Sequence, residues 1–158
     1  MKQVLGCVTL ILISCICFSQ KPANAIFLEY GGPGLVSINY DSRFSKGQNG
    51  FGARIGIGAP FIAFEESRTL LVPMAINYVV GKETSHHLEL GAGVSIAVPL
   101  FIVPTKSFKW NNTFGHLNIG YRYQPVKNGV FFRAALNPAF SKDYFTPFHF
   151  GLALGYKF

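Results

Sequence analysis

Charged and polar side chains that could do chemistry recur in this chain at alternate positions within apolar stretches. The charged ones are Glu29, Asp41, Arg43, Arg54, Glu89, Arg122, Arg133 and Lys157. The uncharged ones are His87, His116, His149, Asn39, Asn77, Asn118 and Asn137. Such a set could form a catalytic cluster or an ion path. It could instead form a hydrogen-bonded polar core, in which each buried charge needs a partner. Three acids against five bases favour the paired core.

Nucleophilic catalysis would need a hydroxyl or thiol within hydrogen-bond reach of a base. His116, Leu117 and Asn118 have the spacing of a His-x-Ser pair, but an amide stands where the nucleophile should be. Ser85 lies two residues from His87, in a segment with the composition of a turn. The sequence therefore predicts a protein that is not an enzyme and has no catalytic residues.

Metal binding is the other chemistry that histidines could supply. His86 and His87 are adjacent, and adjacent residues on a strand point to opposite faces, so both cannot easily hold one ion. No third ligand is near them in the sequence. We expect neither a metal site nor a cofactor.

The elements that position these residues alternate between apolar and polar side chains. In the last stretch Phe148, Phe150, Leu152, Leu154, Tyr156 and Phe158 alternate with His149, Gly151, Ala153, Gly155 and Lys157. A period of two predicts strands with two chemically different faces. The strands are expected at 26–31, 34–44, 51–63, 69–80, 86–98, 114–124, 129–140 and 148–158, with turn residues such as Gly, Pro and Asn between them. The pattern leaves open whether 26–44 is one strand or two.

Two all-β architectures fit this alternation. The apolar faces could point inward, as in a soluble periplasmic or secreted barrel that binds an apolar ligand. They could instead point outward into lipid, around a closed barrel with a polar lumen. Glycine and alanine between the charged residues suit a narrow lumen, and aromatics such as Tyr40, Phe51 and Tyr78 lie near strand ends, where interfacial aromatic girdles belong. These features favour the outward orientation.

Composition agrees with that preference. Charged residues make up 13% of the 158 residues, about half the share usual in soluble domains, and aromatics make up 15%. A chain of this length is expected to form one domain. Its formal net charge of +7 is compatible with anionic lipid head groups, whereas the expected export of the chain argues against nucleic acid as a partner.

The first 25 residues have the layout of a secretory signal peptide. Lys2 precedes an almost wholly apolar run, and Ala23-Asn24-Ala25 fits a small-residue cleavage site. We therefore expect a cleaved signal peptide at 1–25 and a barrel domain at 26–158. Leu12-Ile13-Ser14-Cys15 also resembles a lipoprotein box, so lipidation at Cys15 is an alternative. All three cysteines lie in this segment, and the mature chain would have none.

The last strand resembles the C-terminal insertion signal of Gram-negative outer-membrane β-barrels, with Phe158 at the end and Tyr156 two residues before it. The stretches LELGAG at 88–93, IGYRYQP at 119–125 and KNGVFFRA at 127–134 resemble small outer-membrane barrel proteins of Bacteroidetes type. The resemblance implies that the barrel assembly machinery reads the last strand. It implies no catalytic residues. Lipid A deacylases, a similar-sized class of outer-membrane enzymes, use a His-x-Ser pair that this chain lacks.

We therefore predict a closed antiparallel transmembrane β-barrel of eight strands with short turns, in the cell outer membrane. Eight strands leave an interior that side chains can fill, so a general diffusion pore is not expected. The predicted polar network of the lumen is Glu29, Asp41, Arg43, Arg54, Glu89, His116, Asn118, Arg122, Arg133 and Lys157. The expected role is structural, adhesive or in envelope interactions, with outer-membrane lipids as partners and the protein as a monomer. A lipid-modifying enzyme is the least favoured alternative.

Overall fold

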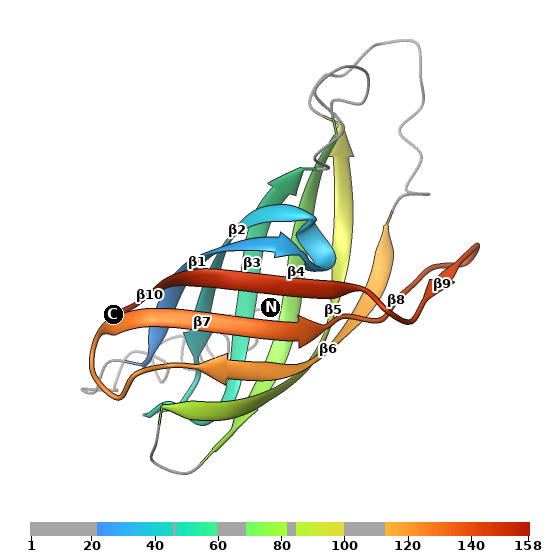
Figure 1. The fold of residues 1–158 in the computed structure, drawn as a ribbon. Coiled ribbons are helices and arrows are strands. Elements are labelled where there is room, and N and C mark those ends of the chain that lie inside the picture. The colour runs from blue at the N-terminus through green and yellow to red at the C-terminus, as the bar shows by residue number, and fades with distance from the viewer. Residues whose placement is uncertain (1–21, 46, 60–68, 82–84, 100–112) are drawn as a thin grey trace, which may run out of the picture.

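The computed structural model describes residues 22–45, 47–59, 69–81, 85–99 and 113–158, which form a closed antiparallel barrel of eight long strands (Figure 1). The strands are β1 (Asn24–Gly31), β2 (Val36–Arg43), β3 (Gly50–Ala59), β4 (Thr69–Val80), β5 (His86–Pro99), β6 (Phe114–Tyr123), β7 (Gly129–Leu136) and β10 (Phe150–Lys157). Each pairs with its neighbour along the chain, β7 pairs with β10, and β10 pairs with β1 to close the ring. The predicted closed antiparallel β-barrel and its number of strands are confirmed.

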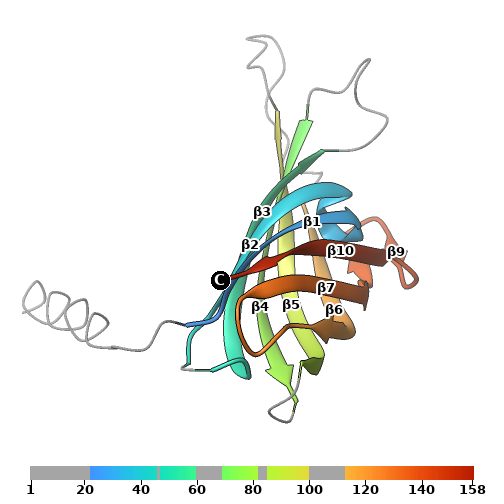
Figure 2. The same cartoon turned by 60° about the vertical axis from the view of Figure 1, so that its left-hand side comes forward.

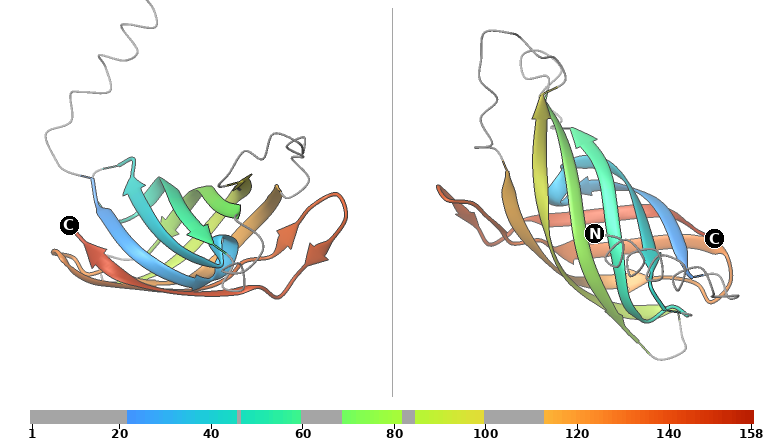
Figure 3. Two further views of the ribbon diagram at one scale, coloured as in Figure 1. Left: turned by 90° about the horizontal axis from the view of Figure 1, so that it is seen from above. Right: turned by 180° about the vertical axis from the view of Figure 1, so that it is seen from behind.

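Opposite walls of the barrel cross, because the strands are tilted. In Figure 1, β10 and β7 run across the view in front of β4 and β5. Figure 3 shows the same tilt from above and from behind. A closed sheet leaves no unpaired edge strand, so each of the eight strands has a hydrogen-bonded neighbour on both sides.

Two short strands extend the barrel wall at one end. β8 (Ala139–Phe140) continues the line of β7 along β6, and β9 (Phe145–Thr146) pairs with β8 as a hairpin that projects beyond the barrel (Figure 2). The expected strand at 129–140 is therefore interrupted at Asn137 and Pro138. Proline has no N–H for the ladder, although its carbonyl oxygen still accepts from the Leu117 amide at 2.9 Å.

The segment 26–44 forms two strands, which answers the question that its sequence pattern leaves open. A buried 3₁₀ turn, η1 (Gly32–Gly34), joins β1 to β2. Gly31 and Gly32 have φ angles of 73° and 68°, a region that glycine enters without steric penalty. The turn contacts β1, β3, β4, β5 and β10, and the Ser95 hydroxyl of β5 donates to the Pro33 carbonyl oxygen at 2.9 Å. η1 thus reaches the wall opposite its own strands.

The remaining differences from the expected strands are small. β3 ends at Ala59 within the described residues, and the expected positions 60–63 lie outside them. β10 begins at Phe150 instead of residue 148. β1 begins at Asn24, inside the expected signal peptide, and Ala25 pairs with Lys157 and with Asp41.

Polarity is distributed across the wall in the opposite sense to that of a soluble protein. Large apolar side chains such as Leu90, Ile119 and Leu152 are exposed on the outer face at 41%, 49% and 54%. The inner face carries most of the buried polar side chains, together with alanine and glycine. Among the described residues, no helix is long and apolar enough to cross a bilayer.

Candidate functional site

The candidate site is the charged interior of the barrel. The structure places all ten residues of the predicted polar network on strands, with at most 6% of each residue exposed. They come from seven of the eight long strands: β1, β2, β3, β5, β6, β7 and β10. β10 carries Lys157. Because residues i and i+2 share a face of a strand, alternation along each strand is enough to turn them all to one side.

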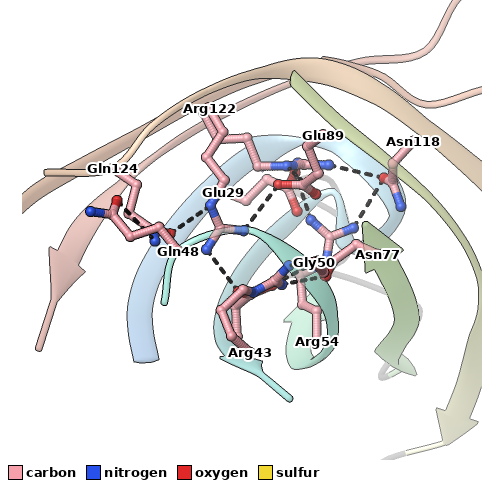
Figure 4. A network of polar contacts seen from close by, with 12 residues as sticks. Glu29, Arg43, Gln48, Gly50, Arg54, Asn77, Glu89, Asn118, Arg122 and Gln124 are labelled. Atoms are coloured by element: carbon pink, nitrogen blue, oxygen red, sulfur yellow. Dashed lines mark hydrogen bonds and ion pairs between the residues drawn. The ribbon is translucent and has the colours of Figure 1, made fainter. Parts of the chain in front are cut away.

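Seven of these residues form a chain of alternating charge that crosses the interior (Figure 4). Its order is Arg43, Asp41, Arg122, Glu89, Arg133, Glu29 and Arg54. The successive nitrogen–oxygen distances are 2.8, 2.8, 3.1, 3.0, 2.5 and 3.9 Å. We call this set the charge chain. It joins six strands from every part of the wall, so it ties together segments far apart in the sequence.

Three amide side chains support the charge chain. The Asn77 amide donates to Asp41 Oδ2 at 2.7 Å and accepts from Arg43. Asn118 Oδ1 accepts from Arg54 and from Arg133, each at 3.0 Å. Gln124 Oε1 accepts from Arg122 Nε at 2.8 Å (Figure 4). Charge-assisted hydrogen bonds of this kind hold buried ion pairs in place and satisfy the donors that the carboxylates leave free.

Two aromatic side chains also face inward beside the charges. Phe27 and Phe131 stack with their ring centroids 4.9 Å apart, and the Arg122 guanidinium carbon lies 4.7 Å from the Phe131 centroid. This distance is within the range of a cation–π contact. Sequence reasoning missed both rings as interior groups. Their parity was the available signal, since Phe27 shares a face with Glu29 and Phe131 shares one with Arg133.

Two of the ten predicted residues lie apart from the charge chain. Lys157 Nζ donates to the carbonyl oxygens of Pro125 and Val126, at 3.0 and 2.8 Å, and so holds the β6–β7 turn. His116 lies beside Ser95, with Nδ1 3.5 Å from the hydroxyl oxygen. This Ser95–His116 pair joins two strands, and no local sequence spacing could have shown it.

The histidines considered for catalysis or metal binding point to different sides of the wall. His87 and His116 are buried on the inner face, whereas His86 is exposed on the outer face with Nδ1 2.6 Å from the Tyr121 hydroxyl. Ser95, the hydroxyl nearest to His116, already donates to Pro33. In the part of the chain that the structure describes, no three His, Cys, Asp or Glu side chains are grouped to hold a metal ion.

Closed antiparallel strands, an apolar outer face and a charged interior define the chain as an eight-stranded barrel with inverted polarity. Among solved structures it is similar to the crystal structure of the N-terminal β-barrel domain of Pseudomonas aeruginosa OprF, with a TM-score of 0.58 and 14% identity. The match covers 88% of this chain and 98% of that one. Identity at this level shows a shared fold. No protein-family model matches the sequence, and neither does any curated protein.

Proposed function

We propose that this protein is a small outer-membrane β-barrel with a filled polar lumen. Its role is structural, adhesive or in envelope interactions, without catalysis. The observation that carries the proposal is the inverted polarity of the wall. Leu90 is 41% exposed, while its neighbour Glu89 is 1% exposed and takes part in the charge chain. An outer face of this kind is stable in acyl chains, and water would have to cover a large apolar surface if the barrel were soluble.

Aromatic pairs on the outer face support a position in a bilayer. Phe51 and Tyr78 lie near the ends of β3 and β4, with their centroids 4.7 Å apart, and Tyr121 and Phe132 are 6.4 Å apart near the same end of the barrel. Aromatic side chains at strand ends are typical of the membrane interface of such barrels. Both pairs therefore fit one membrane interface, at the end of the barrel where the β6–β7 turn lies.

The proposal of a filled lumen rests on two obstructions. The charge chain and the stacked pair of Phe27 and Phe131 occupy the interior as far as Glu29, and η1 packs beside Glu29 and reaches across the barrel end to Ser95. Eight-stranded barrels are narrow enough for side chains to fill them. We therefore expect no diffusion of solutes through the lumen.

The two alternative functions have less support. An apolar ligand at the centre of a soluble barrel would meet the buried charges of Arg122, Arg133 and Glu89 instead of an apolar cavity. A lipid-modifying enzyme would need its nucleophile and base on the lipid-facing surface, whereas His116 and Ser95 are buried inside.

The proposed partners are outer-membrane lipids and the barrel assembly machinery, which would read β10 with Tyr156 and Phe158 on its outward face. We propose that the protein is a monomer and that it is related to small outer-membrane barrel proteins of Bacteroidetes type.

Envelope fractionation tests this function. The protein should remain with the outer-membrane fraction until detergent extracts it, and the unheated sample should migrate differently from the boiled one on a gel. Release by osmotic shock without detergent would instead identify a soluble barrel. Unchanged lipid A in cells that carry His116→Ala, compared with the parent, would remove the enzymatic alternative, and altered lipid A would support it.

A further inference from the structure

The charge chain has an arginine at each end. It contains four guanidinium groups and three carboxylates, so it holds one positive charge more than its acids can balance. All seven residues are at most 3% exposed. A buried charge without a counter-charge is strongly unfavourable, because little water is available to solvate it.

The surplus lies at the Arg54 end. At the other end, Arg43 has a close ion pair with Asp41 at 2.8 Å and further donates to the Gly50 carbonyl oxygen and to Asn77. Within the described residues, the one ion pair of Arg54 is the 3.9 Å approach to Glu29 Oε1, which already accepts from Arg133 at 2.5 Å, while Glu29 Oε2 has no hydrogen-bond partner. Arg54 is therefore the least compensated charge of the chain.

Hydrogen bonding at Arg54 is also incomplete. Its Nη2 donates to Asn118 Oδ1, but Nε and Nη1 have no hydrogen-bond partner although the side chain is 1% exposed. The Asn118 amide nitrogen lacks a partner as well. It lies beside Arg54, because Asn118 Oδ1 accepts from Arg54 Nη2 at 3.0 Å. N–H donors without acceptors thus gather at the Arg54 end of the charge chain.

We propose that a small monovalent anion of the halide class binds beside the Arg54 guanidinium and completes the charge chain. Arg54 supplies the charge and N–H donors, and the Asn118 amide nitrogen supplies a further donor. Charge alternation then continues from Arg43 to the anion without a surplus. A water molecule could satisfy the same hydrogen bonds but would leave the positive charge uncompensated.

The site does not depend on where the protein resides in the cell, so it can be tested on the purified barrel in detergent. Crystals of the full chain grown in sodium bromide should show an anomalous bromide peak within hydrogen-bond distance of Arg54. Bromide found only on the outer surface would identify an adventitious ion only and would overturn the proposal. The same result would leave the outer-membrane function untouched.

Anion-dependent stability provides a second readout. Samples are heated at equal ionic strength and run on a gel that separates folded from unfolded barrel. The band of the folded barrel should persist to a temperature about 2–4 °C higher in chloride or bromide than in gluconate, as expected for a ligand well above its dissociation constant. Arg54→Gln should abolish this difference, whereas Arg43→Gln at the other end of the chain should keep it. An equal halide effect in both variants, or none in the parent, would contradict the site. If Arg54→Gln fails to fold, the bromide peak in the parent decides.

Discussion

Each carboxylate of the interior compensates more than one guanidinium, so single residues matter more here than in a surface ion pair. Glu89 accepts from Arg122 Nη1 at 3.1 Å and from Arg133 Nε at 3.0 Å. Exposed ion pairs are worth little because water screens them. Glu89 is buried and lies at the centre of the charge chain. Replacing its carboxylate with an amide would leave two arginines facing a neutral group.

Glu89→Gln should therefore destabilise the barrel by about 3–5 kcal/mol, the range found when one partner of a buried ion pair is removed. Urea unfolding of the protein in detergent micelles or vesicles would measure the change. Asp143→Asn makes the same chemical change in an exposed turn and should have little effect. Equal stability of the two variants would mean that the charge chain contributes nothing to folding.

At this scale the sequence predicts which face a side chain occupies but not its partner. Parity places Asp41 and Arg122 on the inner face, and their hydrogen bond, which joins residues 81 positions apart, depends on barrel closure and strand register. The same limit explains why the Ser95–His116 pair and the stacking of Phe27 on Phe131 had no sequence signal beyond parity.

At the scale of elements, the strands were predictable and their interruptions were less so. Alternation located β4, β5 and β6 to within one residue at each end. The turn at 31–34 was visible as a glycine-rich segment, but its inward fold depends on partners in β5 and β10 that local composition does not show. The break between β7 and β8 follows from Pro138, which a purely alternating pattern passes over.

Close packing of η1 against β10 leads to a prediction for Gly151. A Cβ atom there would lie 2.9 Å from Glu29 Oε1, 3.0 Å from the Asn137 amide nitrogen and 3.1 Å from the Gly32 Cα. Gly151→Ala should therefore destabilise the barrel by about 1–3 kcal/mol through overpacking. Gly129→Ala, whose new methyl group would approach only the Pro125 ring at 3.2 Å, serves as the control in urea titrations. If Gly151→Ala matches the parent, η1 moves readily and does not seal the barrel end.

The outward face of β10 gives a prediction about membrane depth. Leu152 lies within β10, two residues from its Phe150 end, and is 54% exposed. Leu152→Arg would place a charge within the hydrocarbon layer and should destabilise the inserted barrel by about 2–4 kcal/mol. Phe145→Arg, on the projecting hairpin and 66% exposed, should have an effect of about 0–1 kcal/mol near or beyond the interface.

Unfolding in lipid vesicles would measure both variants. The difference between them separates membrane depth from the general loss of an exposed apolar side chain. Equal costs for Leu152→Arg and Phe145→Arg would indicate that the outer face of β10 is not in contact with acyl chains.

At the scale of the whole molecule, the connections divide into two sets by length and by the end of the barrel at which their flanking strands end. The strand ends that flank the short connections β2–β3, β4–β5 and β6–β7 lie where Asn24 pairs with Phe158. The strand ends that flank the longer connections β3–β4 and β5–β6 lie at the other end, together with η1 and the β8–β9 hairpin. In outer-membrane barrels the short turns face the periplasm and the longer loops face outward.

This asymmetry predicts the orientation of the protein, and two exposed lysines provide a matched test. Lys142 lies in the β8–β9 hairpin turn and Lys127 in the short β6–β7 turn, at opposite ends of the barrel. A membrane-impermeant maleimide added to intact cells should label Lys142→Cys and leave Lys127→Cys unlabelled until the envelope is opened.

Both changes remove one positive charge from an exposed turn, so they differ only in position. The parent chain measures background labelling, which should be absent if the three cysteines are removed with residues 1–25. Labelling of Lys127→Cys but not of Lys142→Cys would reverse the orientation, and equal labelling of both on intact cells would mean that no membrane separates the two ends.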